Sequence, residues 1–145
     1  MQVVKKITAL ETYIVRQEVL RKGKPIETCH FNGDDATTTT HFGLFENENI
    51  IGVVSVFKTN SVLFLEKTQF QIRGMAILEN FQSKGYGEQL LKAAENFCWQ
   101  EKAHLIWFNA REKAVSFYKK SGYTVLGDSF NIPDVGIHFV MFKKN

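Results

Sequence analysis

Apolar side chains recur along this chain with two different periods, which divide it into helical and extended segments. Apolar residues three and four positions apart predict helices, and short runs rich in β-branched and aromatic residues predict strands. The order is helix, hairpin, strand, helix, strand, helix and two strands, which predicts an α/β fold with helices flanking a mixed central sheet. We expect helices over residues 7–20, 85–103 and 113–121, and strands over residues 41–45, 50–58, 69–78, 104–108, 123–126 and 137–142.

The two longer helices differ in how clearly their buried faces are marked. In the first, the apolar positions are Ile7, Leu10 and Ile14, with Val15 and Val19 less regular. The second carries a continuous apolar stripe of the kind that faces a core, made of Leu90, Leu91, Ala94, Phe97 and Cys98. Residues 25–40 predict a loop, and no repeat or linker interrupts the chain, so we expect one domain over residues 1–145.

The segment between the strand over residues 69–78 and the helix after it is Gln82-Ser83-Lys84-Gly85-Tyr86-Gly87, followed by Glu88. Its two glycines permit a sharp turn and leave backbone N–H groups accessible. The helix that begins near Gly85 adds unpaired N–H groups and the positive end of its dipole. Together these groups predict a site for a dianion such as a pyrophosphate, with Lys84 as a nearby cation.

Other interpretations of this segment are weaker. The chain contains no Gly-x-x-x-x-Gly-Lys-Ser/Thr string, which a P-loop requires. Leu90 stands where a dinucleotide-binding fingerprint needs a third glycine or small residue. A purely structural interpretation stays open, in which Gly85 and Gly87 only begin a helix.

The same segment resembles the acetyl-CoA signature of the GNAT family of N-acetyltransferases, Gln/Arg-x-x-Gly-x-Gly/Ala. Gln82, Gly85 and Gly87 occupy the signature positions. Arg73-Gly74-Met75-Ala76-Ile77 is similar to the strand that precedes the loop in this family. Asn109-Ala110-Arg111, then Ala114-Val115-Ser116-Phe117-Tyr118 and Gly122-Tyr123, resembles its second conserved block. The order of elements is also that of the family, and the resemblance covers most of the chain.

The resemblance implies acetyl-CoA as co-substrate and a role for several residues. Its pyrophosphate would bind the backbone of residues 82–88. Its pantetheine arm would lie between splayed parallel strands, residues 69–78 and 104–108, with Met75 and Ile77 as backbone partners. Asn109 would hydrogen-bond the same arm, or it would cap the next helix. Tyr118 would protonate the departing thiolate, although as an aromatic on the inner face of a helix it also fits a core role, and Phe117 is assigned to the same cofactor site.

The group that accepts a proton from the amine is the least defined part of the site. His138 is the first candidate because histidine titrates near neutral pH, but a lone histidine in a strand also fits a structural role. His41, Glu66 and a water beside Gln69 are further candidates. A water relay would make a dedicated base unnecessary.

Composition and charge narrow the function classes. Apolar residues make up 44% and charged residues 23%, which is typical of soluble globular proteins. The net charge of +3 is too small and dispersed to favour nucleic acid, but it suits a polyanionic small ligand. Cys29 and Cys98 lack metal-ligand spacing; we expect Cys98 in the core, whereas the polar surroundings of Cys29 leave a reactive thiol open. No apolar segment approaches a membrane span, no signal-type segment begins the chain, and we expect a cytoplasmic protein without a metal.

These observations favour an acetyl-CoA-dependent N-acetyltransferase that moves an acetyl group to a primary amine of a small molecule or peptide. The reaction would run by direct attack in a ternary complex. A non-catalytic acyl-CoA sensor with the same fold is the alternative. The resemblance implies an acceptor site built from residues 16–35 and 128–138, where Glu27, Asp34, Asp35 and Asp128 either attract a cationic amine or are simply solvated. A homodimer stays open.

Overall fold

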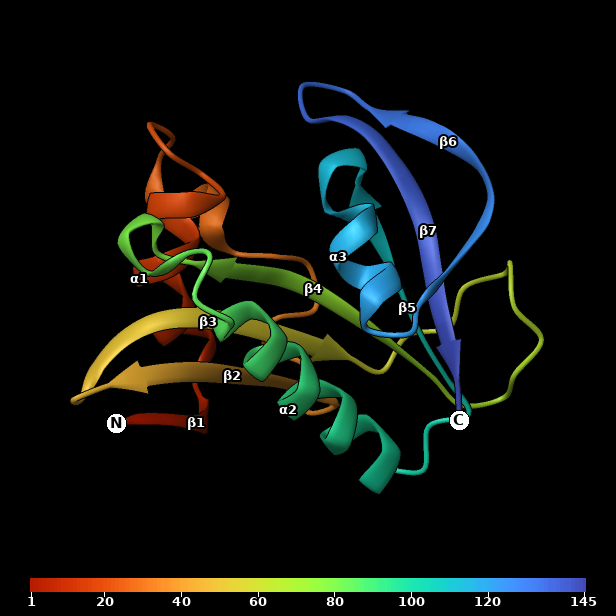
Figure 1. Ribbon diagram of the computed structural model, residues 1–145, viewed down its shortest axis with the longest axis horizontal. Coiled ribbons are helices and arrows are strands. Elements are labelled where there is room, and N and C mark those ends of the chain that lie inside the picture. Colours follow the sequence, from red (N-terminus) through yellow and green to blue (C-terminus); the bar gives the residue numbers. More distant parts are fainter.

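A seven-stranded sheet runs through the computed structural model, which describes residues 1–145 (Figure 1). The strands lie in the order β1-β2-β3-β4-β5-β7-β6, and every neighbouring pair is antiparallel except β4 and β5. The predicted mixed sheet is therefore confirmed. The strands are β1 (Gln2–Ile7), β2 (Thr39–Glu46), β3 (Asn49–Phe57), β4 (Gln69–Ile77), β5 (Leu105–Arg111), β6 (Thr124–Ile132) and β7 (Gly136–Lys144).

Two helices cover opposite faces of the β2–β4 part of the sheet. Alternate residues of a strand face opposite sides, and on β3 Val54 and Val56 join the core cluster that contains Leu90 of α2, whereas Val53 packs with Val15 of α1. The helices are α1 (Ala9–Val19), α2 (Tyr86–Gln100) and α3 (Val115–Lys120), with short 3-10 helices η1 (Ile26–Cys29), η2 (Glu79–Phe81) and η3 (Glu112–Ala114). None of the helices is both long and apolar enough to cross a membrane.

The predicted order of elements is confirmed, with one addition at the start of the chain. The strand β1 was not predicted; it pairs with β2 at the edge of the sheet. Lysines occur at the edges of sheets, where charge discourages pairing with other chains, and Lys5 and Lys6 make this strand look like a solvated segment in the sequence. The first helix accordingly begins after it, at Ala9, where Thr8 and Glu11 form a reciprocal capping box.

The predicted buried face of the first helix is confirmed at Val15 but wrong at Leu10 and Ile14. Leu10 and Ile14 are 72% and 59% exposed, whereas Thr12, Val15 and Arg16 are buried. The helix turns this face inward because Arg16 is paired there with an acidic residue, as described below. On α2, by contrast, Leu90, Leu91, Ala94 and Cys98 are buried as predicted, and the half-buried Phe97 packs against the same cluster.

Candidate functional site

The two parallel strands of the sheet separate soon after they meet. β4 and β5 pair only at Gln69 with Leu105, Phe70 with Ile106, and Gln71 with Trp107, although both strands continue well beyond these pairs. Figure 1 shows β4 and β5 diverging towards the end where α1 and α3 lie. The main chain of β4 that faces β5 beyond Gln71 therefore has no strand partner, so an extended ligand could pair with it.

A bulge in β4 lies within the diverging part. Val53 pairs with Ala76 and Ser55 with Arg73, so β4 carries one extra residue opposite β3. Gly74 in the bulge has φ +65°, a conformation that L side chains rarely adopt. A Cβ at Gly74 would also lie 2.8 Å from Cε2 of Phe31, so both the backbone and the space require glycine there.

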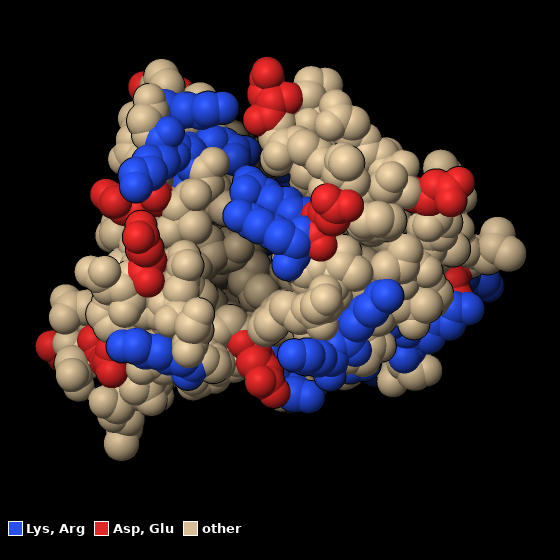
Figure 2. Space-filling model, turned by 45° about the horizontal axis from the view of Figure 1, so that its top comes forward, with Lys and Arg blue, Asp and Glu red and all other residues tan.

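A cleft with a volume of about 850 Å³ opens between the diverging strands. Figure 2 shows the hollow, with Lys and Arg side chains gathered beside it. One side is formed by the end of α1 and the segment after it, and the other by the ends of β5, β6 and β7 with the segment leading into α3. This cleft brings together six of the residues predicted from the sequence: Met75, Ile77, Gln82, Asn109, Tyr118 and His138.

The glycine turn presents a run of free backbone donors at one end of the cleft. Ser83 and Gly85 have φ +63° and +84°, and α2 begins directly after Gly85. The N–H groups of the six consecutive residues from Ser83 to Glu88 donate no hydrogen bond within the protein. The first N–H groups of a 15-residue helix and of the turn before it thus remain available for an anion.

Two side chains of the turn, those of Gln82 and Tyr86, link it to neighbouring strands. The Gln82 amide Nε2 donates to the Ile77 carbonyl at 2.9 Å, which links the turn to the end of β4. The Tyr86 hydroxyl lies 3.2 Å from Nε2 of Gln2 and 3.5 Å from Oε1 of Glu46, so this ring points towards β1 and β2. The Phe117 ring packs over Gly87, 3.6 Å from the position of a Cβ. The side chains of Ser83, Lys84 and Glu88 are exposed.

Tyr118 lies in an aromatic cluster beside the cleft. Its ring centre is 4.3 Å from that of Phe108 and 5.1 Å from that of Phe117. Burial raises the pKa of Tyr118 to about 12, so its phenol is neutral at every physiological pH. The hydroxyl makes no hydrogen bond within the protein, although the residue lines the cleft. Tyr118 thus combines a core-packed ring with a proton that no protein group holds.

Asn109 and His138 lie on neighbouring strands, β5 and β7. Asn109 is exposed in the cleft and its amide has no partner; because Arg111 and Ala114 occupy the cap positions of η3 and α3, the alternative role as a helix cap is wrong. His138 is buried and its Nδ1 lies 2.8 Å from the Gly136 carbonyl. Nδ1 must carry the hydrogen in this contact, which leaves the lone pair of a neutral ring on Nε2.

The other candidate bases lie outside the cleft. His41 is buried between Ser55 and the Asp34 carbonyl, Glu66 forms an ion pair with Lys144 at 3.2 Å, and the Gln69 amide bonds backbone groups of residues 61–66. None of the three lines the cleft. Of the titratable candidates named from the sequence, only His138 does so.

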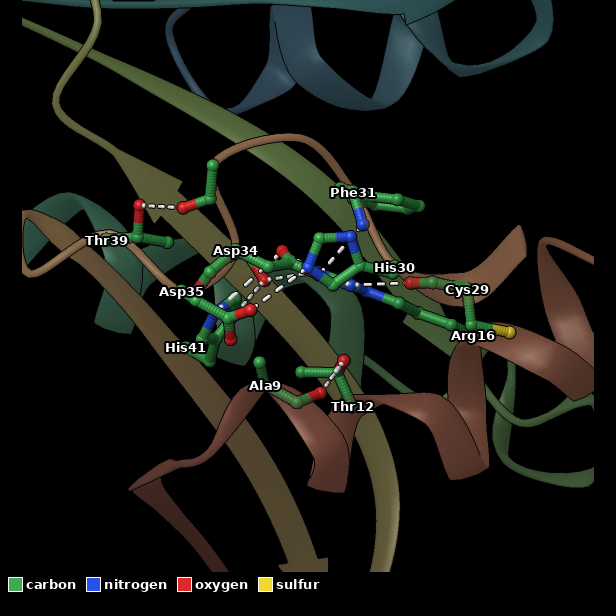
Figure 3. A network of polar contacts seen from close by, with 12 residues as sticks. Ala9, Thr12, Arg16, Cys29, His30, Phe31, Asp34, Asp35, Thr39 and His41 are labelled. Carbon is green, nitrogen blue, oxygen red and sulfur yellow. Dashed lines mark hydrogen bonds and ion pairs between the residues drawn. The ribbon is translucent and has the colours of Figure 1, made fainter. Parts of the chain in front are cut away.

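A buried polar network supports the wall of the cleft beneath Phe31 (Figure 3). Arg16 donates to Asp34 at 2.6 and 3.1 Å, to the Cys29 carbonyl at 2.8 Å and to Ser55 at 2.9 Å, and its guanidinium lies 3.8 Å from the centre of the Phe31 ring. Burial alone would raise the pKa of Asp34, but hydrogen bonds from Arg16 and the Phe31 N–H together with the Arg16 charge hold it below its usual value.

Two expectations from the sequence are corrected by this network. Asp34 is not available to attract a cationic amine because Arg16 occupies both of its carboxylate oxygens. Cys29 is fully buried, and burial raises the pKa of its thiol. The interpretation of Cys29 as a reactive thiol is therefore wrong.

The cleft also contains an aromatic, Phe31, and five cations, Arg21, Lys22, Arg73, Arg111 and Lys113. Phe31, Arg21 and Lys22 lie within residues 16–35, which were expected near the acceptor, whereas the three other cations were not singled out as site residues. In a sequence, charged residues between apolar ones are usually read as the solvated face of a strand or helix. Only the fold shows that these cations converge.

The comparisons with known proteins agree on one family. A family model described as "Acetyltransferase (GNAT) family" matches residues 9–123. The uncharacterized N-acetyltransferase YitI of Bacillus subtilis (strain 168) is 34% identical over 140 residues, which cover 97% of this chain and 94% of that protein. The uncharacterized N-acetyltransferase YjcF of the same organism is 27% identical over 134 residues, covering 92% and 90%.

Solved structures share the fold at low sequence identity. The PaiA N-acetyltransferase from Thermoplasma acidophilum in complex with coenzyme A has a TM-score of 0.74 at 17% identity and covers 100% of this chain and 99% of that one. A GNAT family acetyltransferase from Elizabethkingia anophelis with acetyl-CoA bound has a TM-score of 0.73 at 15% identity, with 99% and 98% covered.

Proposed function

The chain belongs to the GNAT family of acetyltransferases, and from this premise we propose that it transfers the acetyl group of acetyl-CoA to a primary amine of a small molecule or peptide. The observation that carries the proposal is the run of six unpaired N–H groups from Ser83 to Glu88, which follows directly after Gln82 in the lining of the cleft. These donors suit the diphosphate of the nucleotide. Acetyl-CoA would supply an activated thioester, and the chain's own residues would orient it and move protons.

The donor would be oriented by the unpaired edge of β4. Its pantetheine arm would lie between β4 and β5, against the backbone of Met75 and Ile77 and the free amide of Asn109. The bulge at Gly74 turns main-chain groups out of the ladder with β3. A backbone N–H there would face the carbonyl oxygen on which negative charge grows, and one such donor is worth about 3 kcal/mol.

Tyr118 is the proposed general acid. A phenol with a pKa of about 12 holds its proton more tightly than a thiol, whose reference pKa is about 8.5. The proton would therefore move only as the carbon–sulfur bond breaks and charge builds on the sulfur. The neutral phenol has the advantage that it remains a donor at every working pH.

His138 is the proposed proton acceptor, directly or through a water. Its Nδ1 bond to the Gly136 carbonyl fixes the ring and leaves Nε2 without a partner in the protein. An amine must lose a proton to attack, and a neutral imidazole is suited to receive it. The amine would attack the acetyl carbon directly while both substrates are bound.

Two measurements test the proposal. Calorimetry with coenzyme A measures donor binding, and release of free thiol from acetyl-CoA across a broad panel of amines measures transfer. Binding together with amine-dependent thiol release supports the proposal. Binding without thiol release across the whole panel would instead indicate a non-catalytic acyl-CoA sensor, and absence of binding would overturn both functions.

A further inference from the structure

Arg73 occupies the point at which the two parallel strands part. It lies two residues beyond Gln71, the last residue of β4 that pairs with β5, and it lines the cleft. Residues of a strand advance about 3.3 Å each, so Arg73 lies about 13 Å along β4 from Ile77, to which the phosphate-binding turn is bonded. Arg73 is therefore at the acyl end of the cleft, where donor and acceptor would meet.

The guanidinium of Arg73 is oriented but not neutralised. Its Cζ lies 5.1 Å from the centre of the Phe31 ring and 5.2 Å from that of Phe57. Aromatic rings occupy the faces of a guanidinium and leave the N–H groups at its edge free. Arg73 makes no side-chain hydrogen bond and no ion pair within the protein, and Asp34, whose charge acts on Arg73, is hydrogen-bonded to Arg16 instead.

The surroundings of Arg73 are positive and partly dry. The cleft is lined by five Lys and Arg residues and only two carboxylates, Glu18 and Glu79. Burial and the nearby charges of Arg16 and Arg21 lower the pKa of Arg73 from its usual value, although a guanidinium remains charged. A half-buried cation without a counter-ion is costly, and an anionic ligand would relieve the cost.

We propose that the amine acceptor carries an anionic group, a carboxylate or a phosphate, and that Arg73 binds it. The proposal rests on the acetyl transfer proposed above and names the class of its acceptor. Arg21, which lies 5.1 Å from the centre of the Phe31 ring and uses two of its nitrogens to bond the carbonyls of Leu20 and Thr28, would present its remaining N–H groups to the same anion.

The same charges would prepare the amine for attack. Two arginines near an ammonium group disfavour its charged form and lower its pKa, which raises the fraction of neutral nucleophile. A purely cationic amine would be repelled from the cleft. An acceptor with its own anion is attracted first and then loses its ammonium proton more easily.

The experiment compares matched acceptors with and without the anion. The carboxylate arm uses α-amino acids against their amides, and the phosphate arm uses phosphoethanolamine against ethanolamine, with thiol release from saturating acetyl-CoA as the readout. We expect kcat/KM to favour the anionic member of one arm by about 10- to 100-fold, the range for one or two charged hydrogen bonds. The arm that shows the preference identifies the anion.

Variants of Arg73 separate its role from folding and from donor binding. Arg73→Gln should lower kcat/KM for the anionic acceptor more than for its neutral counterpart and so abolish the preference, and Arg73→Lys, which keeps the charge without the fork, should restore part of it. Lys92→Gln, at an exposed position of α2 outside the cleft, should keep the full preference. Calorimetry with coenzyme A should give the same affinity for wild type and Arg73→Gln.

The outcomes distinguish this inference from the function on which it rests. Faster transfer to neutral amines than to their anionic counterparts would overturn the inference and leave acetyl transfer intact. Loss of coenzyme A affinity in Arg73→Gln would also overturn it, because the guanidinium would then serve the donor. Failure of the wild type to acetylate any amine would overturn the proposed function itself, and the inference with it.

Discussion

Arg16 and Asp34 form a doubly hydrogen-bonded ion pair in which neither side chain is exposed to solvent. The pair joins α1 to the segment that carries Phe31, and Asp34 also accepts the Phe31 N–H at 2.9 Å. It therefore sets the position of one wall of the cleft, although Asp34 lies 39 residues before Arg73 in the sequence.

The first prediction concerns this pair. Asp34→Ala should lower the free energy of unfolding by about 3 to 5 kcal/mol because it leaves the Arg16 charge buried and unpaired. Denaturant unfolding measures the loss. Asp35→Ala is the matched control, since Asp35 is exposed and paired only with His30, and it should cost less than about 1 kcal/mol. Similar losses for the two variants would contradict the structural role given to Asp34.

The second prediction concerns Gly85 in the turn proposed to bind the diphosphate. Gly85 and Gly127 have φ +84° and +71°, and a Cβ at either would meet nothing within 4 Å. Alanine at each should cost about 1 to 2 kcal/mol of stability through backbone strain. Only Gly85→Ala should weaken coenzyme A binding, by about 10-fold or more, because strain there rotates the free N–H groups. Equal affinities in calorimetry would remove the turn from the binding site.

The third prediction concerns Gly74 in the bulge of β4. Gly74→Ala adds a clash with Phe31 to the strain of φ +65°, since its Cβ would lie 2.8 Å from the ring. It should therefore destabilise the protein more than Gly127→Ala, and it should lower kcat because the bulge and Phe31 shift together. Unfolding and steady-state rates measure the two effects. A stability equal to that of Gly127→Ala would show that Phe31 moves aside freely.

The fourth prediction concerns Tyr118. Tyr118→Phe keeps the packed ring and removes the proton, so turnover should fall about 10-fold or more with little change in acetyl-CoA affinity. Tyr123→Phe is the control, because the Tyr123 hydroxyl is buried without a hydrogen-bond partner and outside the cleft. It should leave turnover unchanged. An unaltered rate in Tyr118→Phe would remove the general-acid assignment.

The fifth prediction concerns alkaline pH. Burial raises the pKa of Tyr118 from its ordinary value of 10.0 to about 12, so the fold favours the neutral phenol. Its stabilising contribution is complete below about pH 10 and is lost as pH rises towards about 12. Urea unfolding should therefore show wild type losing more stability than Tyr118→Phe across this window. Parallel curves for the two proteins would mean that the phenol is not held neutral by the fold.

The sequence predicts most of the sheet because its strands and α2 are regular in pattern. The turn from Gln82 to Gly87 could be interpreted from residue types and spacing, and the block from Asn109 to Tyr118 through its resemblance to the family. The fold brings Gln82, Asn109 and Tyr118 to one cleft. The buried face of α1 was not legible, because its key residue is Arg16, whose burial depends on an acid 18 residues away. Nothing in a single sequence reports such a partner.

The role of Arg73 was hidden for the complementary reason. In a sequence, an arginine beside apolar residues of a strand looks like any solvated residue. Arg73 is notable because no carboxylate pairs with it in the structure. That absence becomes visible only when Asp34 is seen to be occupied by Arg16 and when the cleft's two carboxylates, Glu18 and Glu79, are compared with its five cations.

The short seam between β4 and β5 has a mechanical consequence. β4 and β5 are joined by only three residue pairs, and beyond these pairs the two halves of the sheet separate. A thioester arm threaded along both strands would act as a brace between these halves. At about a hundred times its dissociation constant such an occupant adds about 2.7 kcal/mol to the folded state. The loaded molecule should thus be the stiffer and more heat-resistant form.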